Sequence, residues 1–394
     1  MIVGVPQESF PGERRVGLVP AVVPNLTKAG LEVVVQSGAG DEAGYPDAGY
    51  VSAGAKILPN RAAVFSAADI LIQVLCYGSN DKTGAEDLPL FRRNQVLIGF
   101  LRPLGSLETI QQIALSGVTA FSVELMPRTT RAQSMDALSS MATISGYKAV
   151  IIAADSLPRL FPMLTTAAGT ITPGRVLVIG CGVAGLQAIA TARRLGAVVS
   201  AYDLRPVVKE QVQSLGGRFV ELDVEVKDAQ DERGYARAQD ESFYKRQRDL
   251  LGKVVAENDV VITTAVVPGK KSPILVTKEM VAGMKPGSVI VDLASERGGN
   301  CELTSTGEKV IQHGVTIIGL INVASTVPYH ASQMYARNVT AFLLHLVKDG
   351  KLQLNMEDQI VRDTLLTHDG EVVNARLREF YSLPALAAQA QEER

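Results

Sequence analysis

The sequence predicts an α/β protein of two Rossmann-like domains, whose parallel sheets are joined by long helical linkers. Short β-branched runs alternate with helix-like segments along most of the 394 residues, the pattern of parallel strands with helical crossovers. A glycine-rich turn at residues 180–185 stands between one such run and a helix, and a long helical pattern over residues 134–156 separates two series of strands. These three observations predict the fold class.

The first series of strands begins at the N-terminus. Its expected strands are IVGVP, LEVVVQSG, ILIQVL, QVLIGFL and VTAFSVE, with the helix-like pieces VPNLTKAG and SLETIQQIALSG between them. We therefore place a first α/β domain at residues 1–133.

The second series supplies six further strand candidates. They are RVLVIG, VVSAYD, RFVEL, DVVITTAVVPG, SVIVDLAS and TIIGLIN. A doubly wound dinucleotide fold needs about six strands, so we expect residues 134–326 to form a second Rossmann domain. A helix and a mixed tail follow, and we expect residues 327–394 to return and complete the first domain.

Composition excludes several classes of protein. Hydrophobic residues make up 46% and charged residues 20% of the chain, as in globular proteins, and a net charge of −2 offers no surface for nucleic acid. The N-terminus lacks a basic region followed by an apolar block, and no run approaches the roughly 18 apolar residues of a membrane span. Three scattered cysteines indicate a reducing compartment and lack metal-ligand spacing. We expect a cytoplasmic protein without a metal site.

The glycine-rich turn is the strongest local signal, because a strand precedes it and a helix follows it. The first glycine permits a tight turn, the second lets the backbone approach a pyrophosphate, and the third lets the helix pack on the strand. The helix N-terminus would then hold the phosphates. The cofactor-binding residues predicted here are Gly180, Gly182, Val183, Ala184 and Gly185.

Asp203, at the end of the next strand, predicts the choice of nucleotide. A carboxylate there accepts hydrogen bonds from both adenosine ribose hydroxyls and repels a 2′-phosphate, so NAD(H) is favoured over NADP(H). Arg205 could serve a 2′-phosphate, but a single arginine behind an aspartate is more often a ribose- or adenine-side neighbour.

Two segments permit two interpretations each. In RAQSMDALSSMA, Gln133, Asp136, Ser139 and Ser140 have the spacing of one helix face, which is either a solvated surface or a ligand-facing one. Residues 223–249 are about half charged and contain Gly234-Tyr235, which predicts either a solvated loop or a lid over a bound ring.

Groups for acid–base chemistry are missing where a dehydrogenase needs them. A dehydrogenase acting on an alcohol or amine moves a proton as well as a hydride, usually through His or Lys. All four histidines lie in the last quarter of the chain. Of these, His313 beside a helix end and His345 within an apolar helical run have structural patterns.

Many segments resemble a known family. They include GVPQESFPGERRVGLVP, ELMPRTTRAQSMDALSSMA, TAAGT, GCGVAGLQAIATARRLGA, VKEQVQSLGG, TTAVVPGK and MKPGSVIVDLASERGGNCE. Nearly end to end, the chain resembles the NAD(H)-binding soluble subunit of the proton-translocating NAD(P) transhydrogenases, which are relatives of alanine dehydrogenase. RAQSMDALSS is the most specific segment, because it separates the transhydrogenase branch from the dehydrogenases.

The resemblance implies a set of site residues. Gln133, Asp136 and Ser139 would position the nicotinamide without acid–base chemistry. The resemblance also implies cofactor contacts at Arg128, Asp203, Tyr235 of a closing loop, and Val266, besides the glycine turn. We add Arg131 and Arg205 to the predicted cofactor-binding residues. The cofactor cleft would lie between the two domains.

Departures from the dehydrogenase pattern favour the transhydrogenase branch. Gln73 stands where alanine dehydrogenase has its catalytic Lys, and Arg102 stands where it has its catalytic His; neither side chain can exchange a proton at neutral pH. Arg15 matches the arginine that holds the substrate carboxylate in alanine dehydrogenase. An alanine dehydrogenase-type amino-acid dehydrogenase is therefore the alternative, and a non-catalytic NAD(H)-sensing module is a third hypothesis.

The implied activity involves other proteins. NADH on this chain would pass hydride to NADP⁺ on an NADP(H)-binding partner subunit, and a membrane component would couple the transfer to proton translocation. The resemblance also implies a homodimer that is held at the membrane through its partner subunits.

Overall fold

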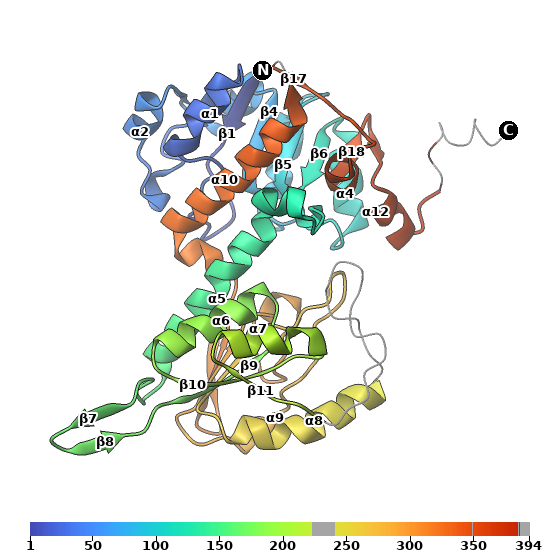
Figure 1. Cartoon of the computed structure of the whole chain (residues 1–394). Helices are drawn as coiled ribbons and strands as arrows, with labels where there is room; N and C mark the ends of the chain where they lie inside the picture. The colour runs from blue at the N-terminus through green and yellow to red at the C-terminus, as the bar shows by residue number, and fades with distance from the viewer. Residues whose placement is uncertain (223–240, 349, 385, 387–394) are drawn as a thin grey trace. The chain divides into compact units, whose positions relative to one another are not determined.

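The computed structural model describes residues 1–222, 241–348, 350–384 and 386 (Figure 1). The chain divides into two compact units, of which the first holds Met1–Met141 with Ser325–Arg394 and the second holds Ala142–Ala324. Both are α/β units with largely parallel sheets, which confirms the predicted fold class. The chain passes between the units within helix α5 (Ala137–Ser156) and within the 3-10 turn η8 (Val323–Thr326), whereas the sequence placed the boundaries after residues 133 and 326.

The first unit contains an eight-stranded sheet in the order β19-β18-β6-β5-β4-β1-β2-β3. Its parallel strands are β1 (Ile2–Val5), β2 (Glu32–Gln36), β3 (Lys56–Leu58), β4 (Ile70–Leu75), β5 (Val96–Phe100) and β6 (Thr119–Ser122). The tail adds two antiparallel edge strands, β18 (Leu365–His368) and β19 (Glu371–Val372). Strand β3 was not predicted, because three residues are too few to form a recognisable pattern.

Helices cover both faces of this sheet. They are α1 (Val23–Lys28), α2 (Asp47–Ser52), α3 (Arg61–Ala67), α4 (Leu107–Leu115), α10 (Pro328–Leu346), α11 (Gln359–Thr364) and α12 (Ala375–Phe380). Leu71 of β4 packs into a core with helices α3 and α4. Helix α10 also contacts the strands of this sheet: the rings of Phe342 and Phe121 lie 5.6 Å apart, and the Tyr335 hydroxyl donates to the Gln73 carbonyl at 2.6 Å.

The second unit contains a seven-stranded sheet in the order β11-β10-β9-β12-β13-β15-β14. Its parallel strands are β9 (Arg175–Ile179), β10 (Val198–Tyr202), β11 (Arg218–Phe219), β12 (Val260–Thr263), β13 (Val289–Asp292) and β15 (Val315–Gly319). These are the six predicted strands. Strand order reverses between β9 and β12, which is the switch point where doubly wound sheets bind ligands.

One additional edge strand, β14 (Lys309–Gln312), pairs antiparallel with β15. His313 and Gly314 form the turn between them with φ values of 52° and 74°. Two positive φ values are the signature of a tight hairpin turn. The prediction that His313 lies at a helix end is therefore wrong.

The helices of the second unit divide its core into two layers. Besides α5, they are α6 (Val183–Arg194), α7 (Lys209–Ser214), α8 (Glu241–Ala256) and α9 (Lys278–Ala282). In β9, Val176 and Val178 pack with α5 and α6, while Leu177 and Ile179 pack with α8 and α9. This alternation is what a strand buried on both faces requires.

Smaller elements complete the described chain. An exposed hairpin of β7 (Leu164–Thr166) and β8 (Gly169–Ile171) extends from the second unit, and β16 (Val347–Lys348) pairs with β17 (Lys351–Leu352) (Figure 1). Neither hairpin was predicted. The other 3-10 turns are Pro20–Val22, Asp41–Ala43, Gly84–Leu90, Val123–Leu125, Thr130–Met135, Pro206–Val208 and Ser295–Arg297.

Helix α5 is the one described helix that is long and apolar enough, by length and composition alone, to cross a membrane. It is not an unbroken apolar run, since Ser139, Ser140, Lys148 and Asp155 lie within it. A core helix passes the same test, and Ala149, Val150 and Ala153 of α5 are fully buried in the core of the second unit.

Candidate functional site

The glycine turn after β9 has the steric features of a dinucleotide-binding loop. Gly180 has φ +96°, a conformation that side chains disfavour. A Cβ on Gly185 would lie 1.8 Å from the Gly180 carbonyl oxygen, so only glycine permits this packing of helix on strand. A Cβ on Gly182 would meet nothing within 4 Å, which leaves open space at the position where a pyrophosphate would approach.

Helix α6 presents its N-terminus beside this open space. Gly182 is the N-cap, and no side chain caps the helix; Val183 and Ala184 form its first turn. Helix α5 packs against that turn, since a Cβ on Gly146 would lie 2.0 Å from the Ala184 carbonyl oxygen. The positive end of a 12-residue helix and its first-turn amides suit a phosphate group, so these residues fit an NAD(H) pyrophosphate.

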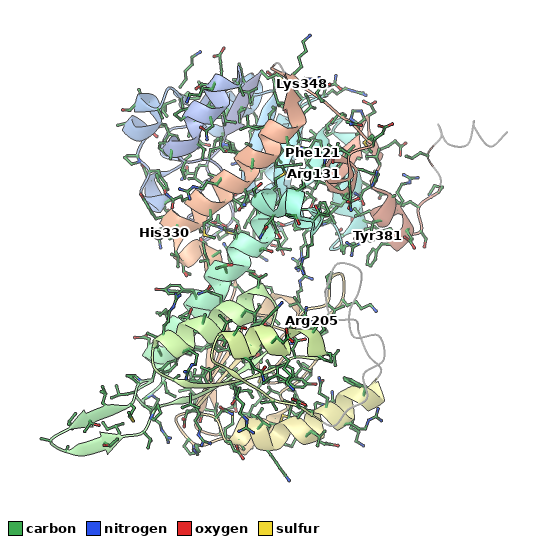
Figure 2. The ribbon with its side chains drawn as sticks, in the orientation of Figure 1. Phe121, Arg131, Arg205, His330, Lys348 and Tyr381 are labelled. Atoms are coloured by element: carbon green, nitrogen blue, oxygen red, sulfur yellow. The ribbon has the colours of Figure 1, made fainter. Side chains whose placement is uncertain are left out.

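Asp203, directly after β10, is held by four hydrogen bonds. Its Oδ1 accepts from the Arg205 backbone N–H at 2.8 Å and from Arg205 Nε at 2.9 Å. Its Oδ2 accepts from the Cys181 backbone N–H at 2.6 Å and from Arg205 Nη2 at 2.9 Å. The side chains of Asp203 and Arg205 are 6% and 12% exposed, so this ion pair is largely shielded from water. Arg205 is labelled in Figure 2.

These four bonds use the acceptor capacity of the carboxylate. A carboxylate offers about four lone-pair sites, and here two go to backbone amides and two to one guanidinium. The sequence assigned this carboxylate to two ribose hydroxyls. Both roles are compatible only when the Arg205 guanidinium gives up its two positions.

The end of β12 is tied to the glycine turn. Thr264 Oγ1 donates to the Gly180 carbonyl at 2.9 Å across the switch point. Val266, which the resemblance placed near the cofactor, lies two residues further on and is half-buried. Thr264 was missed as a site residue, although its place at the end of a predicted strand beside TTAVVPG offered a signal.

In the first unit, the polar residues of RAQSMDALSS do not share a helix face as the sequence predicted. Gln133 lies in the 3-10 turn η5 (Thr130–Met135), and Asp136 follows it before α5 begins. Asp136 then accepts from the Ser139 N–H at 2.8 Å and from Ser139 Oγ at 2.6 Å. Asp136 is thus an N-terminal cap of α5, and its two hydrogen bonds hold its side chain against Ser139. The Gln133 side chain is exposed.

The tail of the chain supports this segment. Asn338 of α10 donates to the Ser134 carbonyl at 2.8 Å. Arg131, labelled in Figure 2, pairs with Asp358, whose other oxygen lies 2.9 Å from His345 Nε2. Arg131 therefore contacts a carboxylate of its own chain.

Arg128 and Tyr235 are the two remaining residues that the resemblance implied. The Arg128 side chain is exposed and lies just before η5. Tyr235 lies outside the described residues, as does most of the segment 223–249 that was considered as a lid; its C-terminal part begins helix α8.

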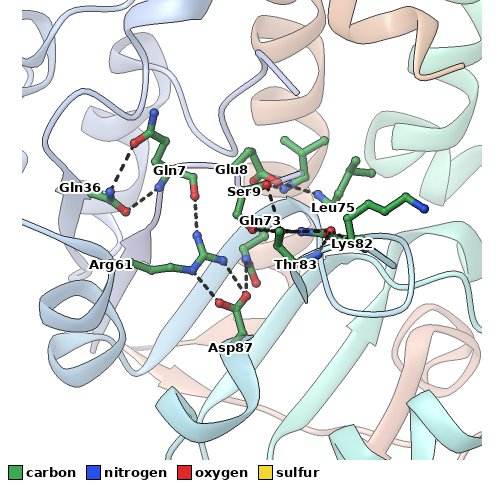
Figure 3. Close-up of polar contacts among 12 residues, drawn as sticks. Gln7, Glu8, Ser9, Gln36, Arg61, Gln73, Leu75, Lys82, Thr83 and Asp87 are labelled. Atoms are coloured by element: carbon green, nitrogen blue, oxygen red, sulfur yellow. Dashed lines mark hydrogen bonds and ion pairs between the residues drawn. The ribbon is translucent and has the colours of Figure 1, made fainter. Parts of the chain in front are cut away.

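A polar cluster that the sequence did not predict lies at the end of β4 (Figure 3). Arg61 binds both oxygens of Asp87 at 2.6 Å, and Gln73 Nε2 donates to Asp87 at 3.0 Å. Glu8 accepts from the backbone N–H groups of Val74 at 2.6 Å and Leu75 at 3.0 Å. Desolvation of the Glu8 carboxyl, followed by repulsion from Glu13, raises its pKa to about 7.

Three positions correspond to functional residues of alanine dehydrogenase. Arg15 forms a buried ion pair with Glu13, with its Nε 2.8 Å and its Nη2 2.5 Å from the two carboxylate oxygens. Gln73 is 1% exposed. Arg102 is exposed, has φ +50°, and donates its backbone N–H to Glu124 at 2.7 Å.

No cluster of three or more His, Cys, Asp or Glu side chains suited to a metal occurs among the residues that the structure describes.

Two domain families match the chain. The alanine dehydrogenase/PNT N-terminal domain matches residues 4–145, and the alanine dehydrogenase/PNT C-terminal domain matches residues 149–375.

Individual relatives include transhydrogenases and an alanine dehydrogenase, and these differ in their sequence identity to this chain. An NAD(P) transhydrogenase subunit alpha protein of Rhodospirillum rubrum is 46% identical over 380 residues, which cover 96% of this chain and 99% of that protein. The alanine dehydrogenase of Bacillus subtilis is 30% identical over 385 residues, covering 94% and 92%. A solved structure of a transhydrogenase from Sinorhizobium meliloti has a TM-score of 0.83 at 45% identity and covers 95% of this chain and 100% of that chain. Of these three, the two transhydrogenases are the more similar in sequence.

Proposed function

We propose that this chain, which belongs to the alanine dehydrogenase/PNT family, is the NAD(H)-binding subunit of a proton-translocating NAD(P) transhydrogenase. The reaction is NADH + NADP⁺ → NAD⁺ + NADPH, with NADP(H) on a partner subunit and a membrane component that couples the transfer to proton movement. The names of the transhydrogenase relatives support this assignment.

The observation that carries the proposal is that residue 73 is a buried glutamine. In alanine dehydrogenase a catalytic Lys stands there, but here an uncharged amide is buried and donates to Asp87. Arg15, the counterpart of the substrate-carboxylate arginine, already binds the carboxylate of Glu13. A 2-oxo acid would therefore find neither a proton donor nor an unpaired guanidinium at these two positions, which argues against the amino-acid dehydrogenase alternative.

Hydride transfer between two nicotinamides needs no acid–base group on the protein. When bound, NAD(H) supplies the hydride. The residues of this chain bind and orient: the glycine turn and α6 hold the pyrophosphate, and Asp203 holds the adenosine ribose. Gln133, Asp136 and Ser139 orient the nicotinamide, and the cap that joins Asp136 to Ser139 fixes two of these three side chains.

The same proposal covers assembly. The chain forms a homodimer, and partner subunits hold it at the membrane. Cross-linking and sedimentation of the purified chain, alone and with the membrane complex, test the dimer and the docking.

Turnover with two sets of reactants tests the function. The purified chain is mixed with an NADP(H)-binding transhydrogenase subunit, and reduction of an NADP⁺ analogue by NADH is followed by absorbance. We expect transfer in the mixture and none in either component alone. The isolated chain is also given NADH, pyruvate and ammonia. Turnover there, or no transfer with a competent partner, would overturn the proposal; the second outcome together with NADH binding would favour a sensing module.

A further inference from the structure

We propose that Asn300 is a positioning residue for the nicotinamide half of the bound dinucleotide, acting through the backbone of Ala265 at the end of β12. The inference rests on the proposed NAD(H)-binding function. Asn300 was not among the predicted site residues, although it lies in the segment MKPGSVIVDLASERGGNCE, which contributes to the family resemblance.

The Asn300 amide pairs with Ala265 as a neighbouring strand would. Its Oδ1 accepts from the Ala265 N–H at 2.9 Å, and its Nδ2 donates to the Ala265 carbonyl at 2.8 Å and to the Pro273 carbonyl at 2.9 Å. The residue is fully buried. Strand β12 ends at Thr263, so Ala265 lies beyond its regular strand pairing. The Asn300 side chain supplies the hydrogen-bond partners for both the backbone N–H and the backbone carbonyl of Ala265.

Asn300 is itself fixed from both sides of its backbone. Its N–H donates to Asp292 Oδ2 at 2.8 Å, and its carbonyl accepts from Leu275 at 2.8 Å and Val276 at 3.0 Å. Asp292 Oδ2 also accepts from the Cys301 N–H at 3.1 Å and from Thr304 Oγ1 at 2.8 Å. The amide thus has no freedom to follow a displaced Ala265; it sets where Ala265 lies.

The strand order indicates which half of the dinucleotide this position serves. The glycine turn after β9 takes the pyrophosphate at the centre, and Asp203 after β10 takes the adenosine ribose on one side. Strand β12 is the neighbour of β9 on the other side, so its carboxyl end faces the nicotinamide half. Because Thr264 also bonds the Gly180 carbonyl, Asn300 extends one hydrogen-bonded frame from the pyrophosphate loop to the nicotinamide side.

The substitution Asn300→Asp tests this role in the full chain. Near neutral pH the new carboxylate can still accept from the Ala265 N–H. Its second oxygen cannot donate, however, and it faces the carbonyl oxygens of Ala265 and Pro273, to which the asparagine amide donates in the wild type. We expect the Kd for NADH to rise by roughly tenfold or more, as for buried polar groups left unpaired. We expect the Kd for ADP, a probe of the adenosine half alone, to be unchanged. Both constants are measured by titration calorimetry, with thermal unfolding as a second readout.

Asn374→Asp provides the matched control in the first unit. Asn374 is also buried, and its amide donates to the Asp363 carbonyl at 2.9 Å and the Leu365 carbonyl at 3.0 Å and accepts from the Leu377 N–H at 3.3 Å. It makes the same three bonds, but to none of the proposed site residues. We expect it to lower thermal stability without changing the ratio of the two Kd values.

The outcomes separate the hypotheses. Equal weakening of NADH and ADP in Asn300→Asp would mean a merely structural role, and unchanged NADH binding would mean no role; either overturns the inference. A wild-type chain that does not bind NADH would instead overturn the proposed function. If Asn300→Asp does not fold, Thr304→Val gives a milder perturbation through Asp292, and the same selective loss of NADH affinity is expected from it.

Discussion

Replacing Arg205 by alanine is expected to tighten NADH binding, although the substitution removes a positive charge from a phosphate-binding unit. The guanidinium occupies two of the four acceptor positions of Asp203. In Arg205→Ala each carboxylate oxygen keeps one backbone N–H, from Cys181 or from residue 205, and has one lone pair open. Two open acceptors on one carboxylate match the two hydroxyls of a ribose.

The expected gain in NADH affinity equals the free energy that the wild-type chain loses when NADH displaces the Arg205 guanidinium from Asp203. Two unit charges about 4 Å apart attract each other by roughly 4 kcal/mol at the effective dielectric of a site near the protein surface, and rehydration of the displaced guanidinium returns most of that. The ribose hydroxyls replace the two lost hydrogen bonds in both proteins. A residual advantage of about 1–2 kcal/mol for Arg205→Ala corresponds to roughly five- to thirtyfold in Kd.

A double-mutant cycle of Arg205→Ala and Asp203→Asn tests the mechanism by titration calorimetry. Asp203→Asn alone should weaken NADH binding by about 1–3 kcal/mol, since an amide nitrogen would face N–H donors. In the double variant the gain from Arg205→Ala should vanish. Arg194→Ala, which removes an exposed arginine in the last turn of α6, is the control for charge. Weaker NADH binding in Arg205→Ala would refute the reasoning, because the guanidinium would then contact the nucleotide itself.

Three further substitutions probe the frame around the site. Gly185→Ala places a Cβ 1.8 Å from the Gly180 carbonyl oxygen, so we expect a loss of several kcal/mol of stability in thermal unfolding, and an unchanged melting temperature would contradict the packing role. Asp136→Ala removes the cap on Ser139 and should cost about 1 kcal/mol, measured by urea unfolding, while Asp136→Asn retains most of it. The pKa of Glu8 is raised from 4.5 to about 7, so between these pH values the folded state binds more protons than the unfolded state. The free energy of unfolding should therefore fall by up to roughly 3 kcal/mol as the pH rises from 4.5 to 7. In Glu8→Gln that decline should disappear; a decline of the same size would assign the proton to another group.

The parts of the site that depend on local sterics could be predicted from the sequence. Gly180 and Gly185 follow an apolar strand and begin a helix. The role of Gly180 depends on its own positive φ, and that of Gly185 depends on the Gly180 carbonyl five residues before it. The same locality explains the six strands of the second unit. A signal for the cap at Asp136 was also present, because Asp directly before an apolar run marks a helix start. The regular spacing of Gln133, Asp136 and Ser139 instead suggested one continuous helix.

Other parts could not be predicted, because they depend on burial and on distant segments. Arg61 and Asp87 are 26 residues apart, and nothing in either local sequence indicates the partner. Glu13 and Arg15 are close in sequence, but only burial of both side chains turns two neighbouring charges into a fixed ion pair. Asn300 reaches Ala265 across 35 residues of chain, and an isolated asparagine in a loop has no pattern that reveals such a contact.

Carboxylates at the strand ends of this chain hold the backbone in place. Asp203 accepts two backbone N–H groups beside β9 and β10, and Asp292 accepts three after β13. Glu124 does the same in the first unit, where it accepts the N–H groups of Leu101 and Arg102. A carboxylate held this way cannot reorient toward a substrate without releasing amides that then lack partners, which costs about 1–3 kcal/mol for each one. Such a frame is poorly suited to a reaction in which an acid must move a proton. It is well suited to one in which the protein's contribution is to keep two rings at a fixed distance while a hydride crosses between them.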